Sequence, residues 1–153
     1  MKYLFFAIFA LGFTNNTQNI SNQNNPSILS NSNFKGKIIG KKMKMKIGTE
    51  AFMATLYDNE TTVEFKAMLP LTVTMSDLNG NEKYAQLPTD LPTSTTDIGT
   101  IHEGDLMLWG ANTLVIFYKT FKTSYRYTKL GHIDNPRGLL SSVGKGSVSV
   151  SFE

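Results

Sequence analysis

The chain contains no cysteine among its 153 residues. This absence excludes disulfide bonds, thiolate metal sites and an N-terminal cysteine that could carry a lipid. Histidine is scarce as well, because only His102 and His132 occur, without the i, i+4 spacing of a helical metal pair. A lone histidine after a strand is usually a hydrogen-bonded structural residue. The sequence therefore indicates neither a metal site nor a bound cofactor.

Long hydrophobic runs are also missing, apart from one at the N-terminus. Lys2 precedes the apolar run Tyr3–Phe13, which is well short of the roughly 20 residues that a membrane-spanning helix needs. Ala10 and Gly12 are small residues at the spacing of a signal-peptide cleavage site. We predict that residues 1–12 are a signal peptide or an uncleaved anchor. The protein would then be exported to the periplasm, envelope or medium, with membrane contact through this segment only.

Large side chains are rare in the next stretch. Residues 14–33 consist mainly of Asn, Ser, Thr and Gln, and such a segment cannot bury enough surface to offset its ordering entropy. We predict a disordered tether over residues 13–36, followed by one folded domain over residues 37–153.

Charge of one sign is in small excess over the whole chain, although six of its 15 cationic residues lie between Lys35 and Lys46. The net charge is +3, too small to argue for nucleic acid by itself. Aromatic and basic residues interleave between residues 118 and 129, a mixture that can bind single-stranded nucleic acid. An exposed strand shows the same alternation, and an exported protein seldom meets nucleic acid, so we expect no such partner.

What the sequence does contain is a strongly apolar hairpin. Asp105–Trp109 and Thr113–Tyr118 read as strands joined by the turn Gly110-Ala111-Asn112. Neither strand shows polar alternation, and a strand that is apolar on both sides is usually buried on both sides. We expect this hairpin to form the centre of the core.

The remaining patterns also favour strands. Lys41–Ile47 alternates lysine with apolar residues, which predicts a half-buried strand, and its charges are typical of a solvated edge strand. Asn79-Gly80, the strongest short hairpin signal, separates two further strands. The other predicted strands are Ala51–Tyr57, Leu71–Leu78, Asn81–Leu87, Arg126–Ile133 and Ser147–Phe152.

Helices and loops complete the domain. Residues 58–70 predict a helix capped by Asn59 or Thr61 and ended by Pro70. Its buried stripe would consist of Val63, Phe65, Met68 and Leu69. We predict loops over residues 88–99 and 121–125, and a second short helix over Pro136–Val143. The sum is a mainly β domain, a closed β-barrel of about eight strands with two short helices covering its ends.

Several strings carry a family resemblance. Residues 62–68 and 110–118 are similar to the E-N-F-x-x-L helix and the G-S-Q-F-F-I strand of cyclophilins. A more specific match is to bacterial cyclophilin-like proteins of unassigned function. Their four motifs are found at Leu69–Tyr84, Gly104–Gly110, Phe117–Phe121 and Tyr127–Ile133. The resemblance covers essentially the whole folded domain and implies a cyclophilin-like β-barrel.

The resemblance also bears on catalysis. Cyclophilins use an arginine on the strand after the first helix to polarise the X-Pro amide, but Arg126 and Arg137 are the only arginines here and neither lies in residues 71–87. Phe117 matches the pocket phenylalanine of the family, whereas the pocket histidine falls at Tyr127 and the pocket tryptophan near Lys122. Lys83 or Arg126 would have to supply the charge from elsewhere.

We therefore assign no catalytic residues and expect binding rather than catalysis. The expected partner is a small molecule or a peptide held in an aromatic-lined pocket at the mouth of the barrel. The candidate lining residues are Met75, Glu82, Tyr84, Trp109, Phe117, Phe121, Tyr127 and Lys129. The alternatives are a divergent peptidyl-prolyl cis-trans isomerase and a purely structural envelope protein.

Overall fold

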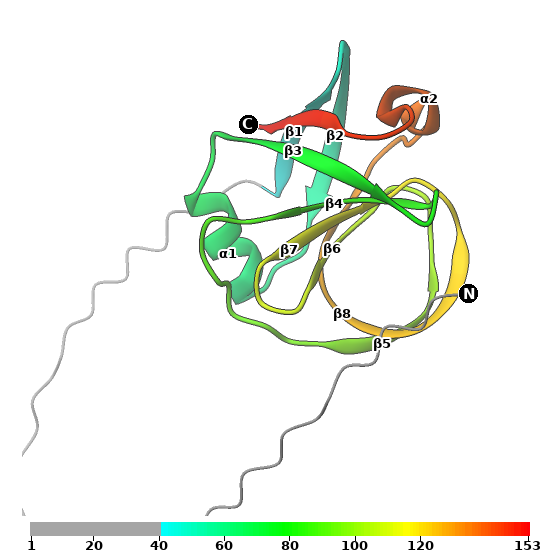
Figure 1. Ribbon diagram of the computed structural model, residues 1–153. Coiled ribbons are helices and arrows are strands. Elements are labelled where there is room, and N and C mark those ends of the chain that lie inside the picture. Colours follow the sequence, from blue (N-terminus) through cyan, green and yellow to red (C-terminus); the bar gives the residue numbers. More distant parts are fainter. Residues whose placement is uncertain (1–40) are drawn as a thin grey trace, which may run out of the picture. The chain divides into compact units, whose positions relative to one another are not determined.

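The computed structural model describes residues 41–153, so the predicted signal segment and tether lie outside the described residues. Figure 1 shows the arrangement of the helices and strands. In chain order they are β1 (Lys42–Ile47), β2 (Glu50–Leu56), α1 (Glu60–Ala67), β3 (Leu71–Leu78), β4 (Glu82–Gln86), β5 (Thr96–Ile101), β6 (Asp105–Trp109), β7 (Thr113–Phe117), β8 (Phe121–Ile133), α2 (Leu139–Val143) and β9 (Val148–Phe152). No helix between residues 41 and 153 has the length and apolar character to cross a bilayer.

The sheet closes on itself. The strand order is β2-β1-β9-β3-β4-β7-β6-β8-β5, and an additional pairing of β2 with β8 completes a ring of eight strands. All the strand pairs are antiparallel, and β5 lies outside the ring, paired with the first half of β8. The prediction of a mainly β, closed fold with two short helices is confirmed.

Strand β1 is an inner strand, and the edge-strand interpretation was wrong. It pairs with β2 on one side and β9 on the other. Its alternate residues are buried as predicted, and its lysines point outward. Their charges are accommodated by ion pairs, Lys42 with Asp134 at 2.7 Å and Lys46 with Glu153 at 3.0 Å, so they do not keep the strand from pairing.

The buried face of helix α1 includes Phe65, as predicted, with Met68 and Leu69 packed against the core just after the helix, but it lacks Val63. Asn59 caps the helix, accepting a hydrogen bond from the Thr62 backbone N–H at 2.9 Å. Thr61, Thr62 and Phe65 are the buried residues, whereas Val63 is 46% exposed. The threonines are buried because their hydroxyls have partners: Thr61 donates to a backbone carbonyl at 2.6 Å. The apolar stripe therefore identified the core contacts of this segment except Val63, and it missed the two buried threonines.

The second half of the domain contains more strand than the sequence predicted. Residues 96–101 form β5, and residues 121–125 begin the 13-residue strand β8, where we had expected loops. Each segment becomes a strand by pairing with the other, Thr96 opposite Tyr127 and Ile101 opposite Phe121. Helix α2 is shorter than predicted, beginning after Gly138, whose φ of 88° is outside the helical region.

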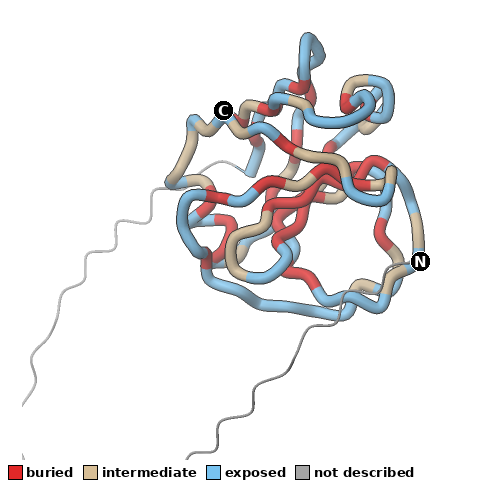
Figure 2. Tube along the Cα trace, in the orientation of Figure 1, coloured by how far each residue is buried: buried red, intermediate tan, exposed pale blue. Residues whose placement is uncertain are grey.

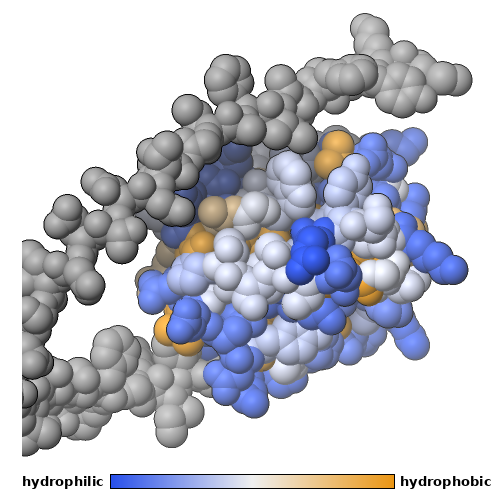
Figure 3. Space-filling view, turned by 90° about the horizontal axis from the view of Figure 1, so that it is seen from below, coloured by the Kyte–Doolittle hydropathy of each residue, from blue (hydrophilic) through white to orange (hydrophobic). Residues whose placement is uncertain are grey.

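The apolar hairpin β6–β7 separates two hydrophobic clusters, as the absence of polar alternation predicted. Leu106, Leu108, Leu114 and Ile116 face the main cluster inside the ring. Met107, Val115 and Phe117 face a second cluster on the opposite side, with Ile101 and Tyr127. Buried segments run along these inner strands in Figure 2, while the connecting loops are largely exposed. On the face seen in Figure 3, hydrophilic residues predominate and hydrophobic ones form small separate patches.

Candidate functional site

The outer face of β4 and β7 forms the wall of a pocket. Because side chains alternate across a strand, every second residue of β4 shares this face with its partner on β7. The pairs are Glu82 with Phe117, Tyr84 with Val115 and Gln86 with Thr113. The intervening residues Lys83 and Ala85 take the opposite side. The site therefore lies over the second cluster, away from the main core, and not at the mouth of the barrel.

The pocket has a volume of about 610 Å³, which falls within the range of roughly 300–1,000 Å³ usual for small-molecule sites. The β3–β4 turn, the end of β6 and the first half of β8 supply the other walls. The lining residues are Leu78, Asn79, Asn81, Glu82, Tyr84, Gln86, Trp109, Thr113, Val115, Phe121, Lys122, Thr123, Ser124, Tyr125 and Tyr127.

Five of the eight predicted residues line this pocket, namely Glu82, Tyr84, Trp109, Phe121 and Tyr127. Phe117 lies directly beneath them and is fully buried. Its ring packs edge-on against Tyr127, with centroids 5.5 Å apart, and lies 5.8 Å from Phe121. These contacts hold the rings of Phe121 and Tyr127 in place. Phe117 therefore supports the pocket floor and is not a lining residue.

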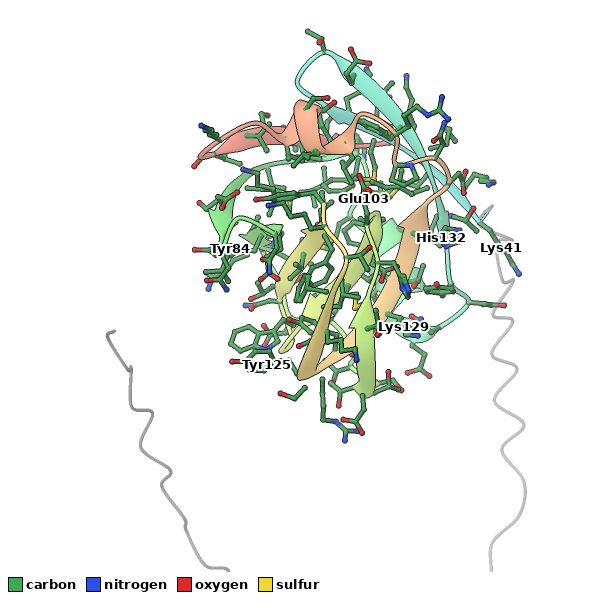
Figure 4. All side chains as sticks on the ribbon, turned by 90° about the vertical axis from the view of Figure 1, so that its right-hand side faces the viewer. Lys41, Tyr84, Glu103, Tyr125, Lys129 and His132 are labelled. Carbon is green, nitrogen blue, oxygen red and sulfur yellow. The ribbon has the colours of Figure 1, made fainter. Side chains whose placement is uncertain are left out.

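Met75 and Lys129 lie elsewhere. Met75 is fully buried in the main core because its position on β3 faces the inside of the ring. Lys129 borders a separate hollow of about 390 Å³ with His102 and Asp105. In Figure 4, Tyr84 and Tyr125 lie on one side of the domain and Lys129 on the other. The predicted set therefore does not come together as a whole.

Glu82 is the unusual polar residue of the pocket. It is only 8% exposed, and within residues 41–153 its carboxyl group has no hydrogen bond or ion pair. Burial, together with the negative charge of Asp77, raises the pKa of Glu82 to about 7. The carboxyl group is therefore close to half-ionised at neutral pH.

The nearby tyrosines are neutral. Burial, with the charge of Glu82 as a smaller cause, raises the pKa of Tyr127 to about 12. Tyr118, just after β7, donates a hydrogen bond from its hydroxyl to Asp77 Oδ2 at 2.6 Å. That bond and one from Lys83 lower the pKa of Asp77.

No arginine reaches the pocket within the described part of the chain. Arg126 lies in an exposed ion pair with Asp97 at 3.3 Å. Lys83 is fully buried, and its Nζ lies 2.9 Å from Asp77 and donates to the carbonyls of Gly146 at 2.6 Å and Gly144 at 3.2 Å. Neither side chain therefore replaces the cyclophilin arginine. Lys122 is the one lysine among the lining residues, and it is exposed.

No group of three or more histidine, aspartate and glutamate side chains suited to a metal ion occurs in residues 41–153. The Asp77–Lys83–Tyr118 cluster is engaged with itself and with backbone carbonyls. Its arrangement suits a structural tie between the β3–β4 hairpin and the loop before β9.

Several lining residues were not predicted. Gln86 has the same alternation as Glu82 and Tyr84, and that period of two could have identified it. Thr123 and Tyr125 were hidden by the loop assigned to residues 121–125. Asn79 was assigned only to the turn, and Asn81 only to the start of the following strand.

Comparisons with known proteins agree with this architecture. The family model described as the cyclophilin-like family matches residues 45–153. The solution structure of a hypothetical protein from Archaeoglobus fulgidus is similar in fold, with a TM-score of 0.52 and 18% sequence identity, covering 75% of this chain and 95% of that one. Comparison with curated proteins gives no match. By its matched residues and its closed ring of strands, the chain belongs to the cyclophilin-like family.

Proposed function

We propose that the domain reversibly binds a small molecule, or a short peptide segment, in the pocket between β4, β7 and β8, and catalyses no reaction on it. The observation that carries this proposal is the composition of the pocket. Its walls combine aromatic rings with hydrogen-bonding side chains, the pattern of sites that bury an apolar ligand and fix its orientation by a few polar contacts.

The aromatic residues at the rim support binding. Trp109 is 53% exposed and Tyr125 is 67% exposed, although both have large apolar rings. Aromatic side chains of this kind dominate the energetics of binding sites because a ligand removes much apolar surface from water when it covers them. The fully buried Phe117 packs against the rings of Phe121 and Tyr127 and supports the floor of the pocket.

Prolyl isomerisation is the less favoured function. The reaction in cyclophilins relies on a guanidinium group beside the bound amide, and no arginine lines the pocket within residues 41–153. The exposed Lys122 is a flexible point charge and does not offer the fixed fork of an arginine.

We further propose that the protein acts outside the cytoplasm. Lys2 followed by the short apolar run Tyr3–Phe13 supports this proposal. Fractionation of cells that express the tagged full chain tests it, with the protein expected in the periplasmic, envelope or secreted fraction. Recovery in the cytoplasm alone would overturn it.

A fragment screen tests binding. The chain has a single tryptophan, and Trp109 lines the pocket, so its indole N–H resonance is a site-specific NMR probe. We expect some fragments to shift this resonance in the full chain, and to fail to bind a Tyr84→Ala variant. A protease-coupled assay with X-Pro peptides should show no turnover above background. Turnover that is lost in Tyr84→Ala would instead establish the isomerase.

A further inference from the structure

The carboxyl group of Glu82, on the wall of the pocket, restricts the kind of ligand that the pocket can bind. Glu82 projects from β4 onto the pocket face and is almost completely buried by its neighbours. Placing a carboxylate in such surroundings is costly unless a positive group or several hydrogen bonds compensate for it. The described part of the chain provides none at this carboxyl group, so a positively charged ligand would supply compensation that the protein itself lacks.

The charged neighbours of Glu82 do not fill that role. Asp77 on β3 is negative and adds to the cost. Lys83, the next residue along β4, points to the other face and is held by Asp77 and two backbone carbonyls. Lys122 belongs to β8, is exposed to solvent, and lies at the wall without a contact to the carboxyl group.

The rings that share the pocket favour the same partner. Tyr84, Phe121 and Tyr127 line it together with Glu82. The face of an aromatic ring carries negative electrostatic potential and attracts a cation, most strongly where water is excluded. Because its pKa is about 12, Tyr127 remains a neutral phenol at physiological pH and keeps this character without adding a charge.

We propose that the ligand of this pocket is an organic cation, an alkylammonium group carried on an apolar body. The ammonium group would lie against the Glu82 carboxylate and the faces of the neighbouring rings, and the apolar body would extend along Trp109 toward the rim. This inference rests on the proposed binding function and narrows it to one ligand chemistry. The same group occurs in free amines and in lysine side chains of peptides, and the experiment separates these two sources.

Binding should depend on pH through Glu82. An ammonium ion is attracted to the ionised carboxyl group, whose pKa without ligand is about 7. The groups facing it are Asp77 from β3, Tyr118 after β7, and Tyr127 and Lys122 from β8. The two tyrosines stay neutral below pH 9, so they do not alter the trend. Affinity should rise about five- to tenfold between pH 6 and pH 8, as Glu82 ionises, and then level off.

The test compares probes of one shape and different charge. The full chain is titrated with 2-phenylethylamine, 2-phenylethanol and 3-phenylpropionate, and dissociation constants are measured from the Trp109 indole resonance. The amine remains protonated throughout this pH range because alkylamines have pKa values near 10. At pH 8 we expect the amine to bind at least tenfold more tightly than the alcohol, and the carboxylate to bind most weakly.

The variant Glu82→Gln isolates the charge while keeping the shape of the side chain. It should bind the alcohol as the native protein does, lose the tenfold preference for the amine, and show no rise in affinity with pH. Glu64→Gln, an exposed change on α1, is the matched control and should behave like the native protein. A capped Phe-Lys dipeptide is the fourth probe: tighter binding than the free amine indicates a peptide source, and weaker binding indicates a free amine.

Three results would each overturn the inference. The first is that the alcohol or the carboxylate binds as tightly as the amine, and the second is that the preference for the amine survives in Glu82→Gln. The third is that none of the probes shifts the Trp109 resonance. In the first two cases the pocket still binds ligands, so the proposed function stands and only the choice of ligand fails. In the third case the fragment screen decides separately whether the pocket binds anything.

Discussion

Replacing Glu82 by glutamine should make the folded protein more stable at alkaline pH. The folded-state pKa of this residue is about 7, raised from its ordinary value of 4.5 by burial and by Asp77. Below pH 4.5 the residue is protonated in both states and does not affect the free energy of unfolding. Between pH 4.5 and 7 the unfolded chain releases its proton while the folded chain keeps it, so the native protein loses stability as the pH rises.

The size of this loss follows from the displacement of the pKa. Each unit corresponds to about 1.4 kcal/mol, so a displacement of this size corresponds to about 3 kcal/mol, fully developed above pH 7. Glutamine keeps the volume and polarity of the side chain and never ionises. The stability gained on going from the native protein to Glu82→Gln should therefore grow by about 3 kcal/mol between pH 4 and pH 8.

Urea unfolding of the full chain, followed by circular dichroism at four or five pH values, measures this difference. All other titrating groups are common to both proteins and cancel in the comparison. Glu64→Gln, an exposed carboxylate on α1, should show no comparable trend. A difference between Glu82→Gln and the native protein that stays constant from pH 4 to pH 8 would refute the argument that burial disfavours the Glu82 carboxylate.

Three further predictions separate structural from binding residues. Lys83→Met should lower the free energy of unfolding by about 3 kcal/mol, because the substitution leaves the Asp77 carboxylate and two backbone carbonyls without their donor. The control Lys145→Met, on the exposed neighbouring loop, should cost little, and equal losses in the two variants would contradict a structural role for Lys83. Gly131→Ala should destabilise the domain severely or prevent folding, since a Cβ there would collide with the backbone of β2 at the seam of the ring; a native-like melting temperature would argue against that closure. Met75→Ala should cost about 2–5 kcal/mol in urea unfolding and leave ligand affinity unchanged, whereas Trp109→Ala should lose affinity with little loss of stability. Affinities of both variants are measured by titration calorimetry, because Trp109→Ala lacks the indole reporter, and the opposite pattern would reverse their roles.

The sequence predicted those parts of the fold that depend on local signals. The turn at Asn79-Gly80 is present, with φ values of 54° and 66°, and the apolar hairpin is buried on both faces. Strand β5 was not predicted because four of its six residues are polar or glycine and its pairing partner lies some twenty-five residues away. Because β5 was missed, residues 121–125 had no recognised partner strand, and β8 was divided into a loop and a shorter strand.

The site was predictable to the extent that it follows strand alternation. Glu82 and Tyr84 were identified and share one face of β4 with the pocket. Met75 was selected for its residue type, although the alternation of β3 places it on the same apolar face as Leu71 and Val73, which pack against the main core. Lys129 lies outside this pocket because a bulge in the pairing of β6 with β8, between Leu106 and Met107, shifts the register of β8 there.

The chemistry of the pocket is thus fixed by the register of a single hairpin. Along β4, Glu82 faces the pocket, whereas Lys83 takes the opposite side and forms the ion pair with Asp77. A slip of one residue would exchange them, placing a lysine in the pocket and a carboxylate beside Asp77. The Asn79-Gly80 turn prevents that slip, and the contacts of Lys83 with the loop before β9 further stabilise the observed register. The buried lysine therefore determines the sign of the charge in the pocket without touching a ligand, because the contacts that hold it leave the carboxylate facing the rings.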